Sequence, residues 1–98
     1  MKQPPMNLES AEAISFKALA FLAEEPQRLV RFLELTGLSL DELREHAGAH
    51  ETKLAVLEHL LSDESLLLVF SAHAGVTPDS IGTAQRLISG QPPAGKTR

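Results

Sequence analysis

The sequence predicts an all-α protein, a compact bundle of five or six helices. Three observations carry this prediction. Apolar residues recur with the three- and four-residue spacing of one helix face over most of the chain. The alternation of apolar and polar residues that marks a strand does not persist in any segment. The β-branched and aromatic residues that strands favour are sparse, and Tyr and Trp are absent.

The length and composition of the chain fit one domain. It has 98 residues and is 43% hydrophobic, which is enough for one core. Double prolines stand near both ends, in segments that contain almost nothing to bury. We therefore expect residues 1–6 to be a disordered N-terminus, residues 7–90 to form a single helical domain, and residues 91–98 to be a disordered C-terminal tail.

The first two helices are separated by a proline. The first is predicted over residues 8–23, and the core of its apolar stripe is Ile14, Ala18, Phe21 and Leu22. Pro26 restarts the chain as a second helix, because proline suits a first turn, where its missing N–H is not needed. Gly37 ends this helix, because glycine adopts the left-handed cap conformation without strain.

A capping box predicts the start of the third helix. The hydroxyl of Ser39 can accept a hydrogen bond from a helical N–H while Glu42 reaches back to the cap. Gly48 closes this short helix, whose inward residues are expected to be Leu40, Leu43 and Ala47. The fourth helix is predicted over residues 51–61, with inward residues Leu54, Leu57, Leu60 and Leu61.

The fifth helix is predicted to be the central element of the bundle. Ser62 is expected to cap it and Gly75 to end it. Residues 66–70 are apolar without interruption, and around a helix they leave no face for water. We therefore expect the other helices to surround it, so that a charge at Leu67 or Phe70 would unfold the protein. The alternative is that part of this surface contacts a second subunit, which would make the protein a homodimer.

The sixth helix begins after Thr77 and completes a pattern that resembles an internal repeat. Its inward residues are expected to be Ile81, Ala84, Leu87 and Ile88. A shift of 38 residues pairs identical residues, among them Leu22 with Leu60, Phe32 with Phe70, Gly37 with Gly75 and Asp41 with Asp79. The chain is then two pseudo-repeated three-helix units. The alternative is that amphipathic helices ending in glycine resemble one another without any repeat.

Three segments of the chain resemble a known family. They are KALAFLAEEP at residues 17–26, LVRFLELTG at residues 29–37 and the run that contains HLLSDESLL at residues 59–67. Together they are similar to the small bacterial proteins grouped as domain of unknown function 3572, over about residues 14–87. The resemblance implies an all-helical cytosolic protein, and it brings no activity and no site residue.

The residue types present argue against catalysis, cofactors and metals. The chain has no cysteine, no nucleophile motif and no glycine-rich phosphate loop, so we expect no enzyme, no catalytic residue and no cofactor. His46 and His50 have the spacing of a helical metal site, but Gly48 between them breaks the helix, and no metal site is predicted. No apolar run is long enough to span a membrane and no signal peptide is recognisable, so we expect a cytoplasmic protein.

Nucleic-acid binding is the alternative function that the sequence leaves open. The helices around Gly75 match the apolar, small and turn positions of a helix-turn-helix, and the second of them could present Ser80, Thr83, Gln85 and Arg86 to a groove. The net charge of −4 and the lack of a basic stripe oppose this interpretation. The favoured prediction, reached mainly by elimination, is a protein–protein interaction or structural module with an unknown protein partner.

Overall fold

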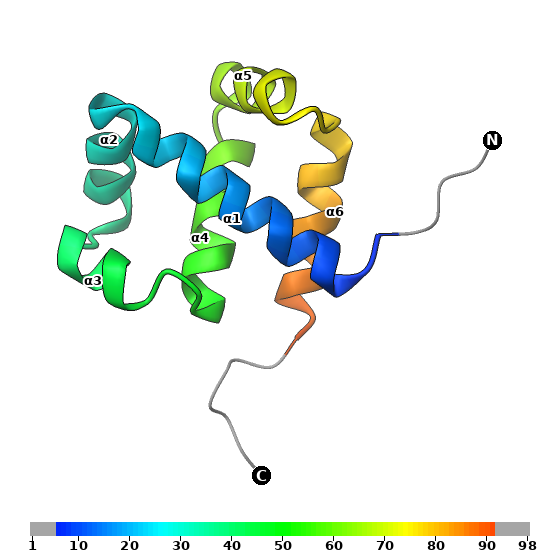
Figure 1. Cartoon of the computed structure of the whole chain (residues 1–98), viewed down its shortest axis with the longest axis horizontal. Helices are drawn as coiled ribbons and strands as arrows, with labels where there is room; N and C mark the ends of the chain where they lie inside the picture. The colour runs from blue at the N-terminus through cyan, green and yellow to red at the C-terminus, as the bar shows by residue number, and fades with distance from the viewer. Residues whose placement is uncertain (1–5, 92–98) are drawn as a thin grey trace, which may run out of the picture.

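A computed structural model describes residues 6–91, which form six helices and no strand (Figure 1). The helices are α1 (Leu8–Glu24), α2 (Pro26–Thr36), α3 (Leu40–Glu45), α4 (His50–Leu61), α5 (Glu64–Ala74) and α6 (Pro78–Ser89). The all-α bundle predicted from the sequence is confirmed. No helix within residues 6–91 combines the length and the apolar character that crossing a lipid bilayer requires.

The longest helix, α1, is the centre of the fold. Its N-cap is Asn7, whose side chain accepts a hydrogen bond of 2.8 Å from the Ser10 N–H. Its buried residues follow helical spacing: Ala11, Ile14, Ser15, Ala18, Phe21 and Leu22. The helix crosses in front of α4 and α6, which pack side by side, and it also contacts α2 and α5 (Figure 1). This stripe therefore joins the two halves of the chain.

The core is built mainly from three phenylalanines and five leucine or isoleucine side chains. The largest fully buried side chains are Phe21, Phe32, Phe70, Leu22, Leu57, Leu60, Ile81 and Ile88. Each contributes on the order of 1.5–3 kcal/mol by leaving water. They come from α1, α2, α4, α5 and α6, so the core holds both halves of the chain together.

The prediction that the fifth helix is central is wrong. Helix α5 buries only Phe70 and Ser71 fully, whereas Leu68 and Val69 are 50% and 49% exposed. The Cα atoms of the protein span 43 × 41 × 18 Å. A body only 18 Å thick holds at most two layers of helices, each about 10 Å across, so no helix can be covered on every side. Helix α5 lies at the edge of this slab (Figure 1).

Two smaller predictions also need correction. Ser62 ends α4 rather than capping α5: its hydroxyl donates a hydrogen bond of 2.8 Å to the His59 carbonyl. Asp63 is the N-cap of α5, and its carboxylate accepts from the Leu66 N–H at 3.2 Å. Leu40 and Leu61, expected to point inward, are exposed. Each lies at a helix end, where the apolar side of the helix extends past the neighbouring helices and is not covered by them.

The two halves of the chain repeat the same local pattern. Helices α2 and α5 each have 11 residues and occupy positions 38 residues apart. Each ends at a glycine in the left-handed region, Gly37 with φ 78° and Gly75 with φ 71°. Phe32 and Phe70 are both fully buried. The halves differ in the third helix, because α3 has 6 residues and α6 has 12.

The predicted disordered ends fall largely outside the described residues. Residues 1–5 and 92–98 lie beyond them. Met6, the first residue described, is half-buried against the core, and the N–H of Gln91, the last, donates to the Ile88 carbonyl at 3.0 Å.

Candidate functional site

The most unusual surface of the protein is the outward side of α5. We call Ser65, Leu68, Val69 and Ala72 the α5 outer face; all four are exposed and none carries a charge. Their spacing places them on one side of the helix, opposite the buried Phe70. The exposed sides of surface helices are normally charged or polar. An uncharged exposed face is therefore a candidate interaction surface.

Local sequence explains why this face is uncharged. The acidic and basic residues of α5 stand only at its ends, with Glu64 in the first turn and His73 in the last, positions that suit the helix dipole. By contrast, the exposed apolar residues Val30 and Leu35 of α2 have the charged Arg31 and Glu34 between them. Helix α2 therefore presents an ordinary mixed surface, and α5 does not.

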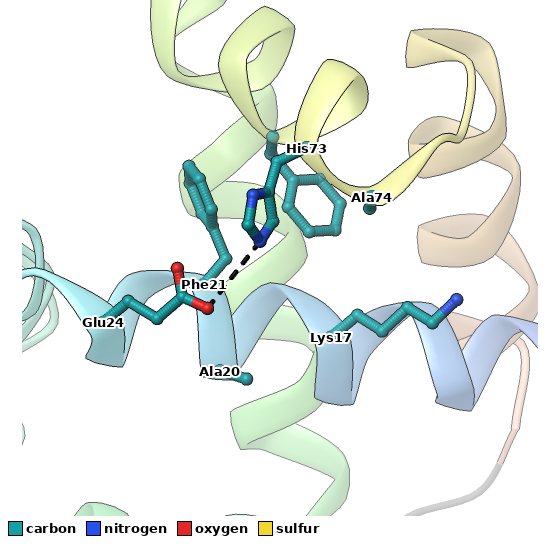
Figure 2. A pocket seen from close by; sticks show the side chains of 7 residues that line it. Lys17, Ala20, Phe21, Glu24, His73 and Ala74 are labelled. Atoms are coloured by element: carbon teal, nitrogen blue, oxygen red, sulfur yellow. Dashed lines mark ion pairs between the residues drawn. The ribbon is translucent and has the colours of Figure 1, made fainter.

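A pocket of about 320 Å³ lies between α1 and α5 (Figure 2). Its lining residues are Lys17, Ala20, Phe21, Glu24, Phe70, His73 and Ala74. The rings of Phe21 and Phe70 meet edge to face with their centroids 5.2 Å apart. These buried rings form the base of the pocket, and the small side chains of Ala20 and Ala74 leave it open.

Charged groups stand at the two ends of this pocket. At one end Glu24 Oε2 lies 3.7 Å from His73 Nε2, and the two side chains point toward each other (Figure 2). Lys17 extends along α1 in the opposite direction. Among residues 6–91 the other ion pairs involve His46 and Lys53, so Lys17 has no carboxylate partner there. The pocket thus combines an apolar base with an unpaired ammonium group.

A buried histidine lies between α2 and α4. The side chain of His59 is 7% exposed, its ring meets Phe32 at 5.2 Å, and its Nε2 has no hydrogen-bond partner among the described residues. Burial lowers the pKa of His59 below its usual value of 6.5, and the nearby Arg31 lowers it further, while Asp63 acts in the opposite direction. His59 is therefore neutral at physiological pH.

We expect the protein to lose stability as the pH falls below about 6.5, because of His59. The His59 imidazole binds a proton more readily in the unfolded chain than in the folded one. As the pH falls below about 6.5, the free energy of unfolding therefore decreases by up to about 1.4 kcal/mol per pH unit. Urea unfolding at pH 7.5 and 5 should show the loss, and His59→Gln should reduce it. His46→Gln, at an exposed histidine, should leave the slope unchanged; an unchanged slope in His59→Gln would refute the assignment.

The residues predicted for a nucleic-acid site lie on α6 and are engaged within the chain. The side chain of Ser80 donates to the Thr77 carbonyl at 2.6 Å and that of Thr83 to the Asp79 carbonyl at 3.2 Å. Gln85 Nε2 lies 3.3 Å from Glu58 Oε2 on α4. Arg86 alone of the four is exposed, and it donates to the Thr83 hydroxyl.

The charges around this helix do not favour a phosphate backbone. Six of the nine Lys and Arg residues, but all thirteen Asp and Glu residues, lie within residues 6–91. The carboxylate of Glu58 is placed beside Gln85, where a nucleic acid would approach. His46 ends α3 and His50 begins α4, so the two belong to different helices. No group of three His, Cys, Asp or Glu within the described range is placed to bind a metal ion.

Sequence reasoning missed the pocket between α1 and α5. No motif or spacing singled out Lys17, Glu24 or His73 as site residues. The pocket depends on residues about fifty positions apart, and no local spacing reports such a contact. Its only trace in the sequence is a pair of small residues, Ala20 and Ala74, beside phenylalanines of two different helices.

The fold and this surface define a small six-helix protein with an uncharged, exposed helix face. Within that class, the chain belongs to the family described as Protein of unknown function (DUF3572), whose family model matches residues 8–91. The resemblance seen in the sequence is thereby confirmed. No curated protein and no solved structure matches the chain.

Proposed function

We propose that this protein is a non-catalytic protein–protein interaction module, and that the α5 outer face docks a second copy of the chain. The observation that carries the proposal is the exposure of Leu68 and Val69 on a helix side with no charged residue. Leaving these side chains in water forgoes hydrophobic free energy that a contact would recover. The absence of a nucleophile motif from the sequence supports a non-catalytic role, and the absence of cysteine supports a cytoplasmic setting.

Symmetry favours a second copy as the occupant. In a two-fold contact each central residue meets its own copy, so any charge there would oppose a like charge. The chain has a net charge of −4, and yet this face carries none. If two α5 helices pack antiparallel about a two-fold axis between residues 68 and 69, Leu68 faces Val69 of the second chain, and both copies of each residue lie close to the axis. Ser65 then faces Ala72 of the second chain, and these small side chains permit close helix approach.

Sedimentation velocity tests the proposed dimer. The wild-type protein should sediment as a dimer at high protein concentration, whereas Leu68→Arg should remain a folded monomer, because the two-fold axis would bring two arginines together. Leu35→Arg is the matched control: Leu35 is 63% exposed on α2, outside the α5 outer face, so this variant should dimerise normally. Circular dichroism should show native helix content in both variants.

The results of this experiment test two claims separately: that the partner is a second copy of the chain, and that the protein is an interaction module. A wild-type protein that stays monomeric at all concentrations would refute the second copy as occupant. The interaction module would survive only if a partner protein then bound the wild-type protein and Leu35→Arg but not Leu68→Arg. Equal behaviour of all three proteins in both assays would refute the proposed function as well.

Nucleic-acid binding through the helices around Gly75 is not proposed. Three of its four candidate residues are half-buried or engaged with the chain itself, and acidic side chains dominate the described surface. A protein that binds DNA gains most of its affinity from phosphate contacts by Lys and Arg, which α6 provides only at Arg86.

A further inference from the structure

We propose that the pocket between α1 and α5 binds a small monocarboxylate with an apolar body. The geometry provides the two parts of such a site: an apolar hollow over Phe21 and Phe70, and an ammonium group on Lys17 that no carboxylate of the described residues neutralises. This inference is independent of the proposed dimer, since the α5 outer face and the pocket use different residues.

The apolar part of the site results from small residues on facing helices. Phe21 and Phe70 hold α1 and α5 together by their edge-to-face contact. Beside that contact, Ala20 on α1 and Ala74 on α5 extend no further than a methyl group, so the helices leave a hollow of about 320 Å³. Small-molecule sites are typically concave and mostly apolar, with a few polar groups that fix orientation. The hollow suits a short hydrocarbon chain or a single ring.

The polar part of the site is Lys17. Lys17 lines the pocket, and its side chain extends along α1 so that the ammonium group lies away from Glu24 (Figure 2). A lysine ammonium is a compact cation with three donors, and a carboxylate is its simplest complement. A ligand lying on the aromatic base would place its carboxylate beside this ammonium group, with a charge-assisted hydrogen bond holding it there.

The opposite end of the pocket restricts the ligand to one carboxylate. Glu24 stands two helical turns, about 10 Å, along α1 from Lys17. Its carboxylate lies 3.7 Å from His73, and both side chains are about half exposed. A ligand with a second carboxylate at its far end would meet the negative charge of Glu24. The site should therefore select monocarboxylates over dicarboxylates of the same length.

Titration of the full-length protein with hexanoate and adipate tests the site. These two acids have the same chain length and differ by one carboxylate. In ¹H–¹⁵N correlation spectra, hexanoate should shift the backbone signals of Lys17, Ala20 and Ala74 saturably, and adipate should not. Lys17→Gln should weaken hexanoate binding about tenfold, the loss of one charge-assisted hydrogen bond, whereas Lys17→Arg should retain it. Arg44→Gln is the control: Arg44 is an exposed residue of α3, outside the pocket, and this variant should bind hexanoate like the wild type.

A variant with a larger side chain in the pocket tests whether the pocket binds a ligand or is only a gap in the packing. Ala20 is exposed on α1, so Ala20→Leu should keep the fold while its side chain occupies the hollow and abolishes hexanoate binding. Absence of saturable hexanoate shifts in the wild type would overturn the proposal. Equal binding by Lys17→Gln, equal binding of adipate, or undiminished binding by folded Ala20→Leu would each overturn it too.

Discussion

Val56→Asp is expected to unfold the protein at physiological pH. Val56 lies on α4, is 1% exposed, and belongs to the core. A carboxylate at this position would be buried without a cationic partner, which costs several kcal/mol even after structural relaxation. Small domains are stable by only about 5–15 kcal/mol, and a chain of this size falls at the low end. Circular dichroism should show loss of helix, and the amide signals should collapse to the range of an unfolded chain.

The matched control is the same substitution on the other side of the structure. Val69→Asp places a carboxylate on α5 where the valine is 49% exposed, so the charge stays in water and the protein should remain folded. The pair distinguishes the observed fold from the one predicted around a central fifth helix. An unfolded Val69→Asp together with a folded Val56→Asp would show that the core is centred on α5 and not on the packing of α1 against α4 and α6.

Phe21→Ala is expected to lower the free energy of unfolding by about 3–5 kcal/mol, as large-to-small changes in a packed core do. The ring is 1% exposed and contacts elements from both halves of the chain. It meets Phe70 at 5.2 Å and His73 at 5.5 Å, and the Arg28 guanidinium lies 4.1 Å from its centroid. Alanine would remove all three contacts and leave a cavity. Urea unfolding followed by circular dichroism measures the loss.

Phe16→Ala provides the comparison on the same helix. Phe16 is 47% exposed, and its ring lies against Gly48 in the connection before α4. Its removal should cost clearly less than removal of Phe21, because half of its surface is already in water and little cavity forms. A loss for Phe16→Ala equal to that for Phe21→Ala would contradict the burial pattern described for α1.

Several helix ends were predictable because their causes are local. Pro26 begins α2, and Gly37 ends it in the left-handed conformation. The predicted capping box forms: the Glu42 N–H donates to Ser39 Oγ at 3.0 Å, and the Ser39 N–H donates to Glu42 Oε1 at 2.8 Å. The hydrogen bond from the Ser39 backbone N–H also lowers the pKa of the Glu42 carboxyl, and the Ser39 side chain lowers it further. Each feature depends on residues within one turn of helix, so the sequence alone contains its cause.

The place of each helix in the fold was not predictable in the same way. Residues 66–70 are apolar on every side of α5, and hydrophobicity favours burial but does not show which neighbours are available. In a body 18 Å thick, the longer α1 takes the central position and part of α5 stays exposed. The pocket beside Phe21 and Phe70 escaped prediction for a related reason, since it forms only where two helices distant in sequence meet.

The packing of α1 against α6 has a consequence for how the chain is made. A ribosome releases residues 8–24 first, but the helix against which much of their apolar stripe packs is residues 78–89. Until residues 78–89 leave the exit tunnel, Ala11, Ile14 and Ala18 lack part of the surface that covers them in the folded protein. The native packing of α1 therefore forms only after residues 78–89 have been synthesised, and until then the apolar stripe of α1 is open to aggregation.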